Sequence, residues 1–160
     1  LNGGKGQLSG VEFVYYQPWT FLPGWLSGFG FQGSLSLTKG EFETPDGSKV
    51  EFPGTSDRIL GATLFYEKYG LSTRLTYQYR TDWLDEVFPS GSTANSNLYW
   101  DETTRLDLSV RYEINPNLSL FLDANNLTDE RGVRYQGVEN RPYEVEGFGR
   151  KYLFGVRASF

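Results

Sequence analysis

The chain has 160 residues, a formal net charge of -5 and a mean hydropathy of -0.47, which argues against nucleic-acid binding and against membrane-spanning helices. It contains no Cys and no His, so it lacks disulfide chemistry, the usual general base and the commonest metal ligand. It also contains no Met, and we therefore expect a processed or partial chain.

Apolar and polar residues alternate in seven segments, each long enough to cross a bilayer at a tilt. In chain order these segments are about 8–19, 29–39, 58–68, 71–81, 105–114, 118–125 and 151–160. The fifth has the clearest pattern, because Leu106, Leu108 and Val110 alternate with charged or hydroxyl side chains. The pattern of the sixth allows it to continue past Asn126 towards Tyr135. The sequence therefore predicts an all-β, antiparallel protein.

The connections between these strands alternate in length. Short turns are expected at 69–70 and 115–117, and a modest turn at 21–27. Long polar loops are expected at 40–57, 82–101 and 129–142. Outer-membrane barrels have short periplasmic turns and long outer loops, whereas a soluble barrel or sandwich does not need this alternation. The connections therefore favour a transmembrane β-barrel.

The polar faces of the predicted strands carry charges that a small, dry core cannot hold without nearly complete pairing. These charges include Arg74, Arg105, Asp107, Arg111 and Glu113. A wide, hydrated or plugged lumen accommodates such groups. Seven strands would leave an unpaired edge in hydrocarbon, and bacterial single-chain barrels have even strand numbers. We therefore expect the chain to form one arc of a larger barrel.

The stretch Asn125-Asn126-Leu127-Thr128-Asp129-Glu130 resembles a box in the penultimate strand of TonB-dependent outer-membrane receptors. The stretch 140–150 resembles the last outer loop and the start of the last strand in that family. The end, 155–160, resembles the terminal signal that the barrel-assembly machinery recognises, although Ala158 stands where a larger apolar residue is commoner. The start, 2–13, resembles the beginning of an inner-barrel strand. The resemblance covers essentially the whole chain and is most specific near its C-terminus.

The resemblance implies a 22-stranded transmembrane barrel filled by an N-terminal plug. Residues 1–160 would be the C-terminal part of the barrel domain, with about its last seven strands, and the plug would lie outside this chain. The implied activity is uptake of a scarce small solute, captured by the outer loops and driven by the TonB complex. Lumen-facing residues that contact the plug would be Arg74, Arg105, Asp107, Arg111 and Glu113. The assembly signal, at the boundary with outer-membrane lipid, would be Tyr152, Phe154, Val156 and Phe160.

The start of the chain is most similar to a proteobacterial branch of the family that is linked to carbohydrate uptake. An oligosaccharide is therefore the expected solute. A siderophore-iron receptor of the same family is one alternative. The others are a small autonomous barrel with a structural or adhesive role, and a soluble lipocalin-like binder.

Acidic side chains gather in the second long loop. Asp82, Asp85 and Glu86 could imitate a pair of catalytic carboxylates or calcium ligands. They share one loop, have no His beside them and lack the spacing of a calcium loop, which is typical of solvated surface acids. We therefore expect no enzyme activity, no metal and no cofactor.

Aromatic side chains accompany these acids. The candidates for a solute-binding loop are Phe88, Tyr99, Trp100 and Asp101, because sugar sites combine aromatic faces with polar groups. The alternative for Trp83 and Trp100 is an outer aromatic girdle at the level of the lipid headgroups. The corresponding periplasmic girdle would be Trp19, Phe21 and Trp25, beside a short turn.

Overall fold

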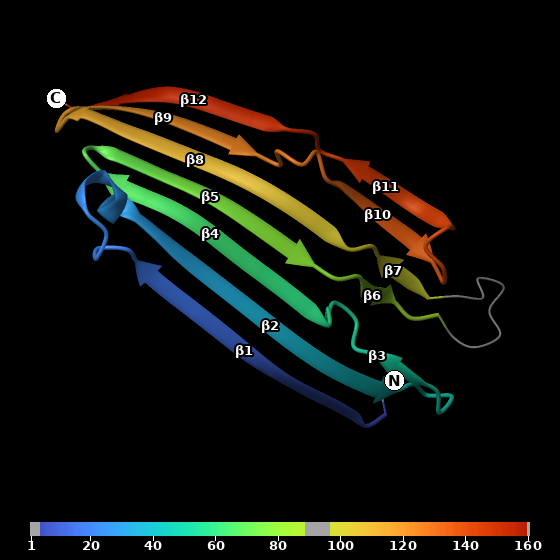
Figure 1. Ribbon diagram of the computed structural model, residues 1–160. Helices are drawn as coiled ribbons and strands as arrows, with labels where there is room; N and C mark the ends of the chain where they lie inside the picture. The colour runs from blue at the N-terminus through green and yellow to red at the C-terminus, as the bar shows by residue number, and fades with distance from the viewer. Residues whose placement is uncertain (1–3, 89–96, 160) are drawn as a thin grey trace.

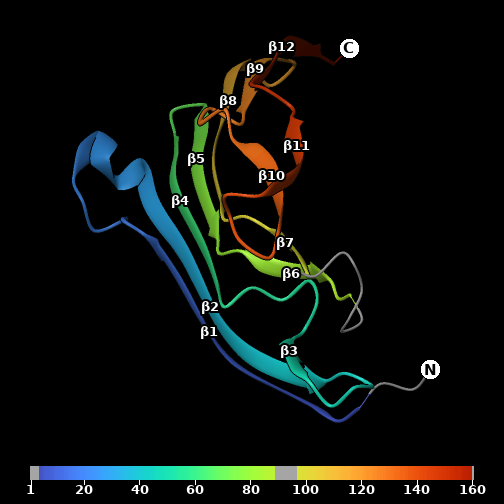
Figure 2. The same cartoon turned by 90° about the vertical axis from the view of Figure 1, so that its right-hand side faces the viewer.

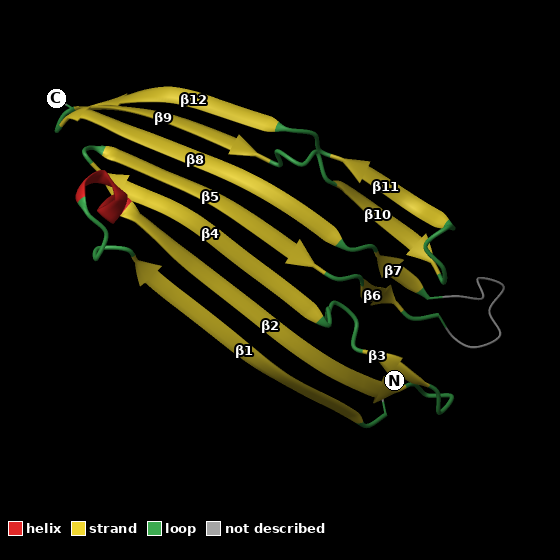
Figure 3. Cartoon of the chain, in the orientation of Figure 1, coloured by secondary structure: helices red, strands yellow, loops and turns green. Residues whose placement is uncertain are grey.

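The computed structural model describes residues 4–88 and 97–159, whose long elements are β-strands (Figures 1 and 3). Seven antiparallel strands form the main sheet in the order β1-β2-β4-β5-β8-β9-β12. Their bounds are β1 Gly6–Pro18, β2 Phe29–Glu43, β4 Arg58–Lys68, β5 Leu71–Arg80, β8 Thr103–Asn115, β9 Leu118–Asn125 and β12 Lys151–Ala158. No helix in the described residues is long and apolar enough to span a membrane.

These seven strands lie within a few residues of the segments that the alternation predicts. The predicted two-residue turn between β4 and β5 is also present, and Tyr69 and Gly70 both have positive φ, at 56° and 74°. Two successive positive φ values are the geometry that joins twisted antiparallel strands most tightly. The modest turn between β1 and β2 contains a short 3-10 helix, η1 Gly24–Gly28.

The three long connections contain short strands, so the prediction of continuous polar loops is wrong, whereas the predicted alternation of short and long connections between the main strands is confirmed. β3 Lys49–Glu51 pairs with the end of β2. β6 Trp83–Glu86, β7 Leu98–Trp100, β10 Arg131–Gln136 and β11 Pro142–Gly147 form a second sheet in the order β11-β10-β7-β6. Strands this short show little periodicity in sequence. They form because the main strands hold their ends side by side.

The sixth predicted strand ends at Asn125 and does not continue past Asn126. Asn126 and Asp129 have φ values of 57° and 58°, in the left-handed region that strands cannot use. The chain turns there and starts again as β10, in the second sheet. The alternation up to Tyr135 therefore comes from two separate strands.

The main sheet is curved, and its polar face lies on the concave side (Figure 2). Ser34, Gly61, Gln78 and Arg105 lie opposite one another in register on β2, β4, β5 and β8. One hollow of about 770 Å³ touches all four residues and also Lys151 of β12. A single hollow can contact these five strands only from inside the curve. The other face, with its alternating apolar residues, is therefore convex.

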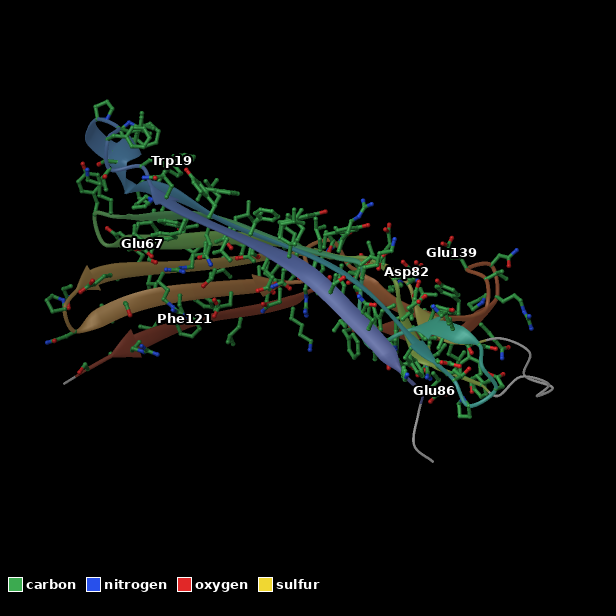
Figure 4. All side chains as sticks on the ribbon, turned by 90° about the horizontal axis from the view of Figure 1, so that it is seen from below. Trp19, Glu67, Asp82, Glu86, Phe121 and Glu139 are labelled. Carbon is green, nitrogen blue, oxygen red and sulfur yellow. The ribbon has the colours of Figure 1, made fainter. Side chains whose placement is uncertain are left out.

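A cluster of aromatic side chains lies at the η1 end of the strands. Trp19 lies beside η1, whereas Asp82, Glu86 and Glu139 lie at the other end (Figure 4). At the η1 end the ring of Phe29 has three aromatic neighbours, Trp19, Trp25 and Tyr66, with centroids 6.3, 6.0 and 4.8 Å away. The side chains predicted to form a periplasmic girdle, with the exposed Phe21 and Trp25, thus gather at one end of the sheet.

On the concave face, Phe65 is the buried aromatic of the main sheet, with 6% of its surface exposed. It lies opposite Gly30 of β2, and its ring stacks on Tyr16 of β1 with centroids 5.5 Å apart. The absence of a side chain at Gly30 leaves room for this ring, because a Cβ there would overlap it.

Replacing Gly30 with alanine is expected to lower the stability of the folded protein by about 1–3 kcal/mol, as overpacking in a filled site does. The reason is that Phe65 must leave its place between β2 and Tyr16. The measurement is the melting temperature of the whole protein in detergent. The control is Gly147→Ala in β11, where nothing lies within 4 Å of the added Cβ. Equal melting temperatures for the two variants would contradict the proposed packing.

Candidate functional site

The second sheet has a small core of its own at the end of the main sheet opposite η1, which we call the mouth. β6 and β10 follow β5 and β9 in the chain, and β7 and β11 precede β8 and β12. Leu84 of β6 and Leu98 of β7 are fully buried, and Tyr135 of β10 is nearly so. This core gives the mouth a fixed shape on which polar side chains can be positioned.

Arg134 of β10 connects three acidic side chains in this sheet. Its guanidinium forms ion pairs with Asp85 and with Glu86, the latter at 3.3 Å, and lies 3.6 Å from Glu144 of β11. The Arg134 side chain is only 14% exposed. Burial alone would lower the pKa of Arg134, but Asp85 and Glu86 outweigh it and the net shift is upward. Arg134 of β10 therefore links β6 and β11 to its own strand through ion pairs.

Replacing Arg134 with glutamine is expected to loosen the second sheet by about 1–3 kcal/mol, because it leaves three carboxylates close together without their cation. The measurement is limited proteolysis of the purified whole protein, with the cleavage sites mapped by mass spectrometry. Cleavage should increase at 82–88, 97–101 and 129–147, which form the second sheet and its turns, and not in the strands of the main sheet. The control is Lys49→Gln, which breaks an ion pair with Glu41 whose partners are both largely exposed. Equal cleavage in both variants would show that Arg134 does not hold the sheet.

Tyr135 follows Arg134 in β10, and its side chain lies on the opposite side of the strand. Its hydroxyl donates a hydrogen bond to Oδ2 of Asp82 at 3.0 Å, and its ring stacks on Tyr99 with centroids 5.5 Å apart. Burial raises the pKa of the Tyr135 hydroxyl, and the bond to Asp82 raises it further. Tyr135 is therefore a neutral donor in the core of the mouth.

Asn126 organises the turn between β9 and β10, and it is buried although polar. Its side-chain amide donates to the carbonyls of Glu130 and Gly149, each at 3.1 Å, and its Oδ1 accepts from the Glu130 N–H at 2.9 Å. Its backbone N–H donates to Oδ1 of Asp107 at 2.7 Å. The side chain thus links the turn to the residues just before β12, and the backbone N–H links it to β8.

Arg80, at the end of β5, is fixed by neighbours on the adjoining segment. Its Nε donates to Oγ of Ser56 and a terminal nitrogen donates to the carbonyl of Gly54, each at 2.6 Å. The guanidinium carbon lies 3.7 Å from the centroid of the Trp83 ring. Ser56 is itself buried and bridges to Trp83. Arg80 is therefore a preorganised cation.

Asn126 and Arg80 also line the hollow on the concave face. Its lining includes Arg80, Arg105, Asn125, Glu130, Phe148 and Lys151. The strands of the main sheet thus supply charges and amides, and the segment before β12 supplies an exposed aromatic ring.

A model of the family described as TonB dependent receptor-like, beta-barrel matches residues 1–127. The chain belongs to this family of TonB-dependent receptor barrels.

No curated protein and no solved structure matches the chain. Receptors of this family are transporters for TonB-dependent uptake across the outer membrane. The match ends at residue 127, so the resemblance of 140–150 and of the terminal segment lies outside it.

The receptor holds the predicted solute-loop residues in fixed positions. Phe88 donates its backbone N–H to Oδ1 of Asn97, and Tyr99 and Trp100 belong to β7. Tyr99 also borders a second hollow, of about 550 Å³, with charged residues of β2 and β3. Trp100 stacks on Trp83, with centroids 6.2 Å apart. Asp101 donates its N–H to the Val133 carbonyl, so these side chains form part of the mouth rather than a free loop.

The acids of the same region contact protein groups. Asp82 accepts from Tyr135, and Asp85 and Glu86 pair with Arg134. In the described ranges, no group of three or more potential ligands could hold a metal ion.

The residues predicted to face the lumen and those predicted to signal assembly lie on opposite faces of the main sheet. Arg74, Arg105, Asp107, Arg111 and Glu113 share the concave face with Gln78, as the register of β5, β8 and β9 shows. Tyr152, Phe154 and Val156 lie on the other face of β12, opposite Ala124, Leu122 and Leu120 of β9. Phe160 lies outside the described residues.

Arg134 and Lys151 are not among the site residues predicted from the sequence. The contacts that hold the guanidinium of Arg80 in place are not predicted either. The signal for Arg134 was the short alternation of Val133, Arg134 and Tyr135, which places the arginine and the tyrosine on opposite sides of one strand. For Lys151, the signal was its alternation with Tyr152 at the start of the closing strand.

Proposed function

We propose that this receptor takes up an oligosaccharide. The observation that carries the proposal is the lining of the concave hollow, where Phe148, 66% exposed, lies with the amides of Gln78 and Asn125 and the hydroxyl of Ser34. Sugar-binding sites combine an aromatic face for the apolar side of the ring with polar groups for its hydroxyls. The aromatic rings of the mouth, including Tyr99, extend this surface outward.

In this proposal residues 1–160 are the C-terminal part of the barrel domain, and a plug supplied by the rest of the protein couples to the TonB complex. Charged residues of the concave face, Arg74, Arg105, Asp107, Arg111 and Glu113, contact the plug. The apolar side chains of β12, together with Phe160, meet outer-membrane lipid and are read by the barrel-assembly machinery. The polarity of the two faces supports this division.

The experiment is a comparison of growth in a strain that lacks the receptor. Loss of growth on one oligosaccharide as sole carbon source, with normal growth under iron limitation, is the expected result. Disabling TonB must produce the same loss. A defect confined to iron limitation would overturn the oligosaccharide and favour a siderophore receptor.

Replacing Phe148 with alanine in the whole receptor is expected to weaken binding of that oligosaccharide by about 2- to 10-fold, the range that follows from about 0.5–1.5 kcal/mol for one aromatic contact. The measurement is titration calorimetry in detergent. Phe21→Ala is the matched control, because Phe21 is equally exposed but lies next to η1, at the far end of the strands. Unchanged affinity in the Phe148 variant would remove this ring from the site.

A further inference from the structure

Cations collect in the concave hollow although the chain as a whole is acidic. The chain has 15 Lys and Arg against 20 Asp and Glu. The hollow is lined by three cations, Arg80, Arg105 and Lys151, and by one acid, Glu130. These residues come from three strands and one turn, so the excess of positive charge is produced by the fold and is not visible as a basic run in the sequence.

Internal carboxylates neutralise this charge poorly. Arg105 has one ion pair, in which its Nε lies 3.7 Å from Oδ1 of Asp107, and its side chain remains 54% exposed. The same Asp107 oxygen also accepts the backbone N–H of Asn126. Arg80 and Lys151 form no ion pair within 4–88 and 97–159. In the described part of the chain, Arg105 is thus the one cation of the hollow with an ion-pair partner, and that carboxylate is already occupied.

The two arginines are also close neighbours. Arg105 lies opposite Gln78 in the register of β5 and β8, and Arg80 is two residues further along β5 on the same face. The Cα atoms of such diagonal neighbours lie about 7–8 Å apart, so two long cationic side chains at these positions can come close enough to repel each other. An anion between them converts this repulsion into two charge-assisted hydrogen bonds.

Arg80 is already oriented for such a role. Two of the five N–H donors of its guanidinium are used by Ser56 and Gly54, and the Trp83 ring supports the group. The remaining donors have no partner in the described part of the chain. A fixed guanidinium loses little conformational entropy when it binds a ligand.

We propose that this hollow binds an anionic group on the transported solute, and that the solute is an acidic oligosaccharide whose carboxylate lies among Arg80, Arg105 and Lys151. Phe148 packs against the sugar ring that carries this carboxylate. This inference rests on the proposed uptake of an oligosaccharide. The proposed uptake does not specify the charge of the oligosaccharide, and this inference does.

The test compares a uronate-containing oligosaccharide with a neutral one of equal length. Both are titrated against the whole purified receptor and followed in uptake by cells. In the double variant Arg105→Gln/Lys151→Gln, both changes are at exposed side chains, and the neutral sugar controls for any change in the contact between Arg105 and the plug. The dissociation constant for the acidic sugar should rise about tenfold or more, as expected for the loss of hydrogen bonds to a charged group, and that for the neutral sugar should stay within about twofold.

Two further variants control the result. Arg105→Lys keeps the charge and should retain most of the affinity for the acidic sugar. Lys39→Gln removes a cation of β2 that does not line this hollow, and it should change neither affinity. Equal effects on both sugars, or no effect on the acidic one, would overturn the anion site.

The outcomes also separate the two proposals. If the receptor takes up only the neutral sugar, the anion site is wrong and the proposed function stands. If it takes up neither sugar but binds a ferric siderophore, the proposed function and the acidic oligosaccharide are both wrong.

Discussion

Replacing Leu108 with arginine is expected to remove most of the receptor from the outer membrane. Leu108 is in the middle of β8, and its partners in register are Leu75 of β5 and Ala124 of β9. The convex face around it is therefore apolar, and we expect this face to meet lipid in the barrel. An arginine on that face costs about 2–4 kcal/mol if it lies at the midplane of the bilayer. The measurement is the amount of full-length receptor in the outer-membrane fraction.

The matched control for this variant is Thr76→Arg. Thr76 adjoins Leu75 on β5 but lies on the concave face, opposite Asp107 of β8. An arginine there meets a carboxylate and water instead of hydrocarbon, so the receptor should reach the membrane at its usual level. Equal loss of the two variants would show that the faces do not differ in this way. A normal level of the Leu108 variant would contradict the assignment of the convex face to lipid.

The same difference between faces explains why the main sheet could be predicted from sequence. Along β8 one face carries Leu106, Leu108 and Val110 and the other carries charged or hydroxyl groups, because the two faces meet different surroundings. In the second sheet no such difference is imposed. Val133 lies opposite Val145 and Arg134 opposite Glu144, within strands of six residues. A pattern that short does not distinguish a strand from a polar loop.

The site was harder to predict because its contacts join residues far apart in the chain. Arg80 bonds to Ser56 and Gly54, which precede it by 24 and 26 residues. Asn126 bonds to Asp107, 19 residues before it, and to Gly149, 23 residues after it. The resemblance identified the box that contains Asn126 but not the partners of this side chain. The register of the strands determines those partners, and the alternation of apolar and polar residues in one sequence does not show that register.

Replacing Asn126 with alanine is expected to be the most destabilising change in the mouth, by about 2–4 kcal/mol. Four side-chain hydrogen bonds are lost, including the one that the Thr128 hydroxyl donates to Oδ1 of Asn126, and alanine must keep a φ of 57°, which it rarely adopts. The Glu130 N–H and the Gly149 carbonyl then remain without these partners. The measurement is hydrogen exchange of the backbone amides at 126–130 and 149–151 in the whole receptor, together with its melting temperature. Unchanged exchange in both segments would contradict the role assigned to Asn126.

Two further substitutions at this position separate backbone conformation from hydrogen bonding. Asn126→Gly tolerates the positive φ but makes no side-chain bond, so it should recover about 1 kcal/mol of the loss in alanine. Asn126→Asp keeps the acceptor for the Glu130 N–H but loses both amide donors and places a second carboxylate near Asp107. The aspartate variant should therefore keep protection at 126–130 and lose it at 149–151, where the bond to Gly149 precedes Lys151. Equal loss in both segments would mean that the turn and the start of β12 unfold as one unit.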